Sequence, residues 1–168
     1  MTAHAPRLPR ARLLSATQVA RCCGVDIKTI HNWANKGKIA HDRTAGRHLR
    51  FRPLDVVDFL QSYEMGLPDW LRGVRLVAVV VDADTQTLAG ARRSLARRFD
   101  LVVCGHAVDA LVAVGTHLPD VLVVGNASPL DAPMLAARLR ACDSTRHVRV
   151  VPLGDPHRLR ETLEALTS

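Results

Sequence analysis

The sequence lacks any apolar run of the roughly 18 residues that a membrane-spanning helix needs. Its start, which contains Pro6-Arg7-Leu8-Pro9-Arg10, also lacks the apolar stretch of a signal peptide. We therefore expect a cytoplasmic protein with no membrane partner.

Cysteine is sparse, with 4 in 168 residues, and none of them shows CxxC or Cys/His ligand spacing. We interpret all four as reduced, mostly buried thiols. The sequence also lacks a phosphate-binding loop, a convincing Ser/His/Asp order, and a GxGxxG motif after the first strand of its second half, where Asp82-Ala83-Asp84-Thr85 stands instead. These absences predict a protein that is not an enzyme and has no metal site and no cofactor.

Charge is distributed unevenly along the chain. Residues 1–75 carry 13 Lys and Arg against 6 Asp and Glu, whereas residues 76–168 carry 10 against 10, so the first part holds the whole net charge of +7. A polyanion facing the first part would gain from counterion release. With 48% hydrophobic residues, the chain can form two small cores. The division predicts a DNA reader joined to a neutral partner domain.

Two short helices are predicted near the start, after residues 1–12, whose lack of periodicity indicates a flexible arm. Ser15 and Gln18 have the S-x-x-Q spacing of a capping box, and Gly24 suits the end of the first helix. The short turn from Gly24 to Asp26 is typical of a DNA-binding helix pair.

Asp26 can cap the second helix, which we expect over residues 27–36. Its apolar positions share one face and predict the buried side: Ile27, Ile30, Trp33 and Ala34. The outward positions combine cations with groups that can address base edges: Lys28, Thr29, His31, Asn32 and Lys36. A solvated charged face is the alternative reading of this pattern. The short turn before the helix favours DNA binding.

Residues 38–43 and 47–52 alternate sufficiently to form two strands around Thr44-Ala45-Gly46, which predicts a hairpin wing. Strand periodicity places Leu49 and Phe51 on one face and points the basic side chains outward from the other face, as candidate DNA contacts: His48, Arg50 and Arg52. Pro53 suits the first turn of a third helix.

Two segments closely resemble the MerR-like and excisionase-like winged helix-turn-helix domains, especially the BldC type. They are Val25 to Ile39, with the pattern V-D-x-K-T-I-x-x-W-x-x-x-G-K-I, and Arg43 to Phe51, with the pattern R-T-x-G-R-H-x-R-F. The resemblance covers residues 13–63. It implies that the second helix enters the major groove and that the hairpin contacts the backbone or the adjoining minor groove. It assigns Lys28, Thr29, Asn32 and Lys36 to the groove, and Arg43, Thr44, Arg47, His48 and Arg50 to the wing. The family's Gly-Gly before the wing His or Arg is replaced here by Ala45-Gly46-Arg47.

After a predicted linker over residues 64–74, residues 75–168 show short β-branched runs separated by helical segments. Strands are expected at 76–81, 101–104, 121–124 and 148–151, and helices at 83–98, 108–117, 132–142 and 156–166. The predicted fold class is therefore α/β overall, with a winged helix-turn-helix followed by a flavodoxin-like, doubly wound parallel sheet.

This β-α order and the segment from Pro119 to Asp131 resemble the receiver domain of response regulators, in a shortened form without the fifth strand. The resemblance places Gly125 at the phosphoacceptor position, where no side chain can be phosphorylated. We interpret Asp82, Asp84 and Asp131 as helix caps and loop charges rather than as a magnesium site. The shortened sheet would expose an edge, which favours a homodimer or a protein partner.

The leading hypothesis is a nucleoid-associated bacterial regulator that binds double-stranded DNA and uses a non-phosphorylatable receiver-like module for dimerisation or partner binding. The alternatives are a non-enzymatic adaptor whose MerR-like domain docks a protein, a regulator whose second half senses a small ligand, and a phosphorylation-dependent regulator, which Gly125 disfavours.

Overall fold

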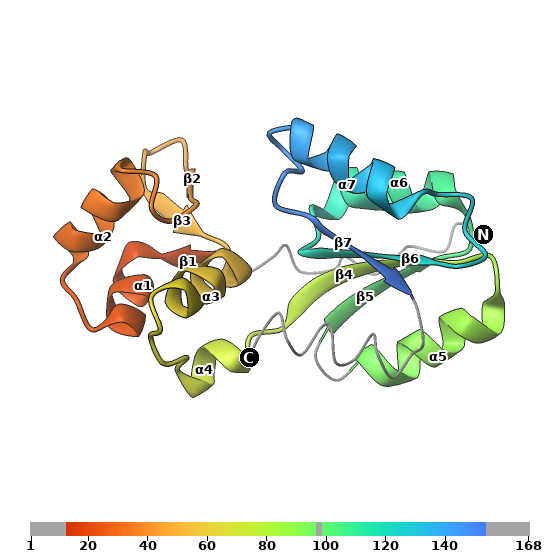
Figure 1. The fold of residues 1–168 in the computed structure, drawn as a ribbon, viewed down its shortest axis with the longest axis horizontal. Helices are drawn as coiled ribbons and strands as arrows, with labels where there is room; N and C mark the ends of the chain where they lie inside the picture. The colour runs from red at the N-terminus through yellow and green to blue at the C-terminus, as the bar shows by residue number, and fades with distance from the viewer. Residues whose placement is uncertain (1–12, 97–98, 154–168) are drawn as a thin grey trace. The chain divides into compact units, whose positions relative to one another are not determined.

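A computed structural model describes residues 13–96 and 99–153. The described chain divides between Val74 and Arg75 into two compact units (Figure 1). The predicted arm at 1–12 and the predicted final helix at 156–166 lie outside the described residues. In the described part, no helix has the length and apolar character needed to cross a membrane.

The first unit contains the predicted helix pair, α1 (Ala16–Cys23) and α2 (Ile27–Asn35). The capping box at the start of α1 is confirmed, since the Gln18 backbone N–H donates to Ser15 Oγ and the Ser15 backbone N–H donates to Gln18 Oε1. Gly24 ends α1 at φ 64°, a left-handed conformation that glycine adopts without strain. Asp26 caps α2 by accepting from the Thr29 N–H at 2.8 Å.

A small antiparallel sheet follows the order β1-β3-β2. It consists of β1 (Leu14–Ser15), β2 (Asp42–Arg43) and β3 (Leu49–Phe51). The predicted hairpin is thus present as β2 and β3, with shorter strands than the alternation suggested. Strand β1 has only two residues, too few for strand periodicity to reveal, and pairs with the other edge of β3.

Helix α3 (Pro53–Ser62) begins at Pro53 as expected and closes the core of this unit. The ring centroids of its Phe59 and of Trp33 lie 5.2 Å apart. Ile27, predicted to face inward, is instead 44% exposed. The buried stripe of α2 is centred on Ile30 and Ala34 and is narrower than the spacing of apolar residues suggested.

The predicted linker at 64–74 is a structural part of the first unit. It contains the short helix α4 (Asp69–Arg72), and Leu67 and Leu71 belong to the same buried cluster as α1, α2 and α3. Trp70, in α4, is 44% exposed. The glycines and prolines of this segment are typical of a loop. The two leucines stand alone among them, without the helical or strand spacing of apolar residues that would predict their burial.

The second unit contains a four-stranded parallel sheet with the order β5-β4-β6-β7. The strands are β4 (Leu76–Val81), β5 (Phe99–Cys104), β6 (Val121–Gly125) and β7 (Arg149–Leu153). The connecting helices are α5 (Thr85–Leu95), α6 (Ala107–His117) and α7 (Ala132–Ala141). The expected alternation of strands and helices is confirmed, and this architecture is compatible with a flavodoxin-like fold.

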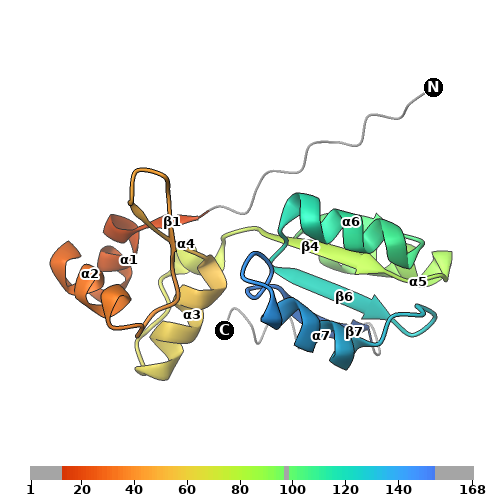
Figure 2. The same cartoon turned by 90° about the horizontal axis from the view of Figure 1, so that it is seen from above.

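The helices cover both faces of the sheet, with α6 and α7 on one face and α5 on the other (Figures 1 and 2). The reversal of strand order at β4 explains this, because right-handed crossovers to the left and to the right place helices on opposite faces. All six residues of β4 and all five of β6 are buried, as expected for central strands of such a sheet.

Candidate nucleic-acid interface

The exposed side of α2 carries most of the polar residues predicted to bind DNA. Lys28, His31, Asn32 and Lys36 are all exposed, and their spacing of three, four and eight residues places them on one helix face. Thr29 is half-buried at the border of this face, and its backbone N–H is bound by Asp26. The face combines two ammonium groups with an amide and an imidazole, which suits contact with phosphates and with base edges.

Asn35 also lies on this face, seven residues after Lys28, and the sequence reading missed it. Its Oδ1 accepts a hydrogen bond of 2.8 Å from Nη2 of Arg43, on strand β2. Nη1 of the same guanidinium donates to the backbone carbonyl of Arg47 at 3.2 Å. Helical spacing from Lys28 would have found Asn35, but its pairing with Arg43 depends on where the hairpin folds.

The hairpin tip is closed by three short-range hydrogen bonds that centre on Thr44. The Thr44 N–H donates to the His48 carbonyl at 3.0 Å, and the Arg47 N–H donates to the Thr44 carbonyl at 2.7 Å. The His48 N–H donates to Thr44 Oγ1 at 3.1 Å. Thr44 therefore shapes the tip, while the side chains of Arg47 and His48 are exposed.

Arg47 adopts φ 61°, the left-handed conformation that favours glycine. The residue that departs from the Gly-Gly pattern of the resembled family thus occupies a position in which glycine would be unstrained. Gly46 does not have a positive φ. The tip keeps a tight turn by placing an exposed cation at its strained position.

Arg50 and Arg52 lie on the strand face opposite the buried Leu49 and Phe51, as alternation predicts, but both are half-buried. Arg50 donates from Nη1 to the Leu49 carbonyl at 2.9 Å. The Arg52 side chain is only 12% exposed, and its Nε lies 3.7 Å from Oδ2 of Asp42. Alternation assigns the two arginines to the correct strand face, but cross-strand pairing with β2 covers that face in part.

Residues 13–63 match the family described as the helix-turn-helix domain. The match includes α1, α2, the hairpin and α3, and it ends before α4. A comparison of the chain with curated proteins gave no match. The match covers less than half of the chain, and it coincides with the helix pair and hairpin that the structure shows in the first unit.

In the second unit, the carboxyl ends of the strands place Asp82 beside Gly125. Asp82 follows β4 and is 2% exposed, and its Oδ1 accepts from the Asp84 N–H at 2.7 Å. A Cβ added at Gly125 would overlap the Asp82 carboxylate and lie 2.6 Å from the Asp82 Cβ. The space beside β6 that a side chain at position 125 would need is therefore filled by Asp82.

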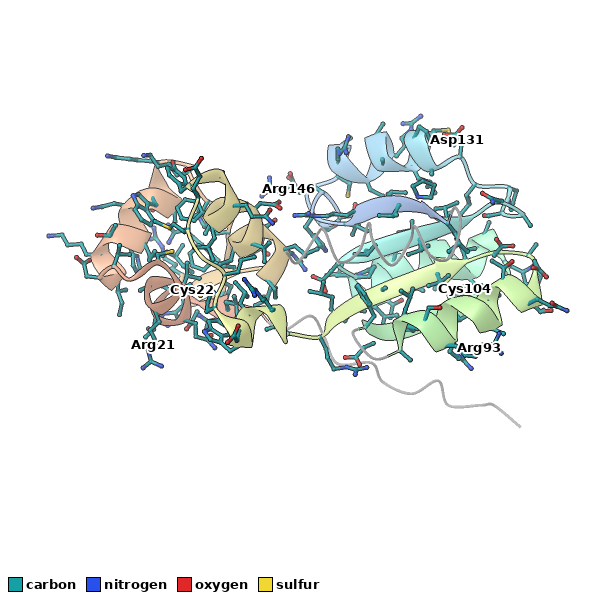
Figure 3. All side chains as sticks on the ribbon, turned by 60° about the horizontal axis from the view of Figure 1, so that its bottom comes forward. Arg21, Cys22, Arg93, Cys104, Asp131 and Arg146 are labelled. Carbon is teal, nitrogen blue, oxygen red and sulfur yellow. The ribbon has the colours of Figure 1, made fainter. Side chains whose placement is uncertain are left out.

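The neighbouring acidic residues act as helix caps, as predicted. Asp84 accepts from the backbone N–H groups of Gln86 and Thr87, and the Thr87 hydroxyl, together with these amides, lowers the pKa of its carboxyl. Asp131 begins α7 by accepting from the Met134 N–H at 2.7 Å (Figure 3). Among residues 13–96 and 99–153, no group of three or more His, Cys, Asp and Glu side chains could hold a metal ion.

Burial distinguishes the thiols. Desolvation raises the pKa of Cys22 to about 11, and the neighbouring Cys23 adds to the effect. Cys142 is exposed, and hydrogen bonds from Ser144 lower the pKa of its thiol. Cys104 is buried as expected, Cys22 and Cys23 are half-buried, and the expectation of a buried thiol is wrong at Cys142.

Proposed function

We propose that the chain is a bacterial transcriptional regulator in which α2 reads the major groove of duplex DNA and the hairpin contacts the adjoining backbone. The observation that carries this proposal is the two-sided character of α2. Ile30 and Ala34 are buried in the core, while Lys28, Asn32 and Lys36 are exposed on the other side. The match to the helix-turn-helix family over residues 13–63 supports the same role.

The proposal predicts a strong dependence of DNA affinity on salt. We would measure fluorescence anisotropy of a labelled duplex titrated with the full chain between about 50 and 200 mM salt. If about four to six phosphates are neutralised, log K falls with log salt at a slope of about −4 to −5. A flat response would refute DNA binding and favour docking of a protein by this domain.

Base reading and backbone contact are separated by two substitutions. Asn32→Ala is expected to reduce the preference for a selected site over random duplex by about 1 to 3 kcal/mol, because an amide can pair with a base edge. Lys36→Ala is expected to weaken binding to both duplexes equally and to reduce the salt slope by about one. Arg138→Ala removes the same charge from α7 in the second unit and serves as the control. Equal losses on both duplexes for Asn32→Ala would show that α2 does not read bases.

We propose further that the second unit is a receiver-like module that acts without phosphorylation and mediates self-association or partner binding. The packing of Asp82 against Gly125 supports the first part, because it excludes a phosphoacceptor side chain from position 125. Exposed apolar residues on α6 support the second part: Val108 at 70%, Leu111 at 43% and Val112 at 63%. They follow the i, i+3, i+4 spacing of one helix face.

Sedimentation velocity of the full chain tests the association. If α6 forms a self-association surface, the wild type sediments as a dimer and Val112→Asp sediments as a monomer. Ala89→Asp, at an exposed position of α5 on the opposite face of the sheet, is the control. A wild type that is monomeric at all concentrations would refute self-association, and docking of another protein or a ligand would be left for this unit.

A further inference from the structure

The guanidinium of Arg43 joins the last residue of α2 to the tip of the hairpin. It donates from Nη2 to Asn35 Oδ1 at 2.8 Å and from Nη1 to the Arg47 carbonyl at 3.2 Å. We propose that Asn35 and Arg43 are positioning residues that hold the hairpin tip against the end of the reading helix. This inference rests on the proposed function, in which α2 and the hairpin contact the same DNA duplex.

The hairpin needs such a support because its own ladder is short. Strand β2 has two residues, and it pairs with β3 through Asp42↔Arg50 and Arg43↔Leu49. Beyond Arg43 the chain leaves the ladder, and the hydrogen bonds around Thr44 close the turn only upon itself. Among the described contacts of the tip, the Arg43 guanidinium connects it to α2.

An arginine is suited to this task and a lysine is not. The planar guanidinium presents several N–H donors in a fixed fork, so one group can satisfy the Asn35 amide oxygen and the Arg47 carbonyl at the same time. A lysine ammonium retains the positive charge but has no fixed geometry for two acceptors. The charge of Arg43 and its bridging role can therefore be separated by Arg43→Lys.

The consequence for recognition is pre-organisation. Arg47 and His48 are exposed on the tip, and Lys28, Asn32 and Lys36 are exposed on α2. A tip that is fixed relative to α2 presents both sets together, so less conformational freedom is lost when DNA binds. Asn35 and Arg43 would thus affect affinity through Arg47 and His48, whereas the sequence reading assigned Arg43 to DNA contact.

A double-mutant cycle on the full chain tests the pair. Asn35→Ala and Arg43→Ala are each expected to weaken binding to a duplex by about three- to tenfold, and the double variant should lose no more than the larger single loss, because both remove one connection. Arg43→Lys should lose as much as Arg43→Ala. If Arg43→Lys binds like the wild type, or the two single losses multiply, Arg43 contacts phosphate directly and the positioning role is refuted.

A second measurement needs no DNA and therefore distinguishes failure of this inference from failure of the proposed function. Amide hydrogen exchange of His48 and Thr44, both bonded within the tip, is expected to rise by about threefold or more in Asn35→Ala and Arg43→Lys. Asn35→Ala replaces a helix residue by the best helix former, so α2 itself is not weakened. His31→Ala, on the same exposed face, is the control and should leave this exchange unchanged. Unchanged exchange in Asn35→Ala would overturn the inference, whether or not the chain binds DNA.

Discussion

The substitution Gly125→Ala tests how tightly the end of β6 is packed in the second unit. In Gly125→Ala, the new methyl group would overlap the carboxylate of Asp82 and lie 2.6 Å from its Cβ. The overlap cannot be relieved by the far end of a flexible chain, because Asp82 is 2% exposed and its Oδ1 is bound by the Asp84 N–H. Either the β6 backbone or the buried carboxylate has to move.

Two effects contribute to the expected loss of stability, the overpacking at position 125 and the loss of the hydrogen bond to Asp82. Overpacking of a close-packed interior costs about 1 to 3 kcal/mol, and loss of the hydrogen bond to a carboxylate adds about 1 to 3 kcal/mol. Partial relaxation makes a total of about 3 kcal/mol reasonable. With a urea m-value of about 1.5 kcal/mol per M, the unfolding midpoint of the second unit falls by about 2 M.

The distribution of aromatic residues provides the assay. Both tryptophans and the single tyrosine of the chain lie in the first unit: Trp33, Trp70 and Tyr63. Indole fluorescence therefore reports unfolding of the first unit, while far-UV circular dichroism reports both. Gly125→Ala should shift the dichroism transition and leave the fluorescence transition in place.

Two further variants decide whether Asp82 is the cause. Gly115→Ala in α6 is the matched control, since an added Cβ there meets nothing within 4 Å, and it should stabilise the unit by up to about 1 kcal/mol. Asp82→Gly in the Gly125→Ala background removes the overlapping side chain and should recover part of the loss. A Gly125→Ala protein as stable as the wild type, or a double variant no better than Gly125→Ala alone, would refute the reasoning.

Three other predictions concern the first unit and the exposed thiol. Leu71→Ala should destabilise the first unit by about 2 to 5 kcal/mol, because its side chain is 2% exposed and lies in the core cluster. The fluorescence transition measures this loss. A loss below about 0.5 kcal/mol would show that residues 64–74 act only as a linker. Arg52→Ala should lower the urea midpoint of the first unit and leave the salt slope of DNA binding almost unchanged, because the Arg52 side chain is 12% exposed and faces Asp42. A salt slope reduced by about one would instead show that Arg52 contacts a phosphate. Cys142, whose thiol pKa is lowered, should react with iodoacetamide at about pH 8 before the other thiols, because a lower pKa increases the thiolate fraction. Peptide mass spectra taken at successive times give the order of modification. Earlier modification of a thiol in α1 would contradict this order.

Much of the fold could be predicted from local signals. The capping box of Ser15 and Gln18, the left-handed Gly24 and the cap at Asp26 are short-range hydrogen-bond patterns, so neighbouring residues determine them. The strands of the second unit were also predictable, because central parallel strands are buried on both faces and therefore form continuous apolar runs.

The candidate interface was only partly predictable. Helical spacing correctly placed Lys28, Asn32 and Lys36 on the exposed side of α2, because one face follows from the period of the helix. Strand spacing could not show that Arg52 is largely covered, because this depends on the partner strand that places Asp42 beside it.

The sequence by itself determined which segments form α1, α2, α3 and the central strands of the second unit, and which part of the chain carries the positive charge, since these depend on neighbouring residues or on composition. Only the tertiary structure decided which distant groups meet. It brought Arg43 to the end of α2, buried Leu71 in the first core and filled the space beside Gly125 with Asp82. Such contacts join segments separated by many residues, and their geometry arises from packing, for which no local pattern in the sequence provides a signal.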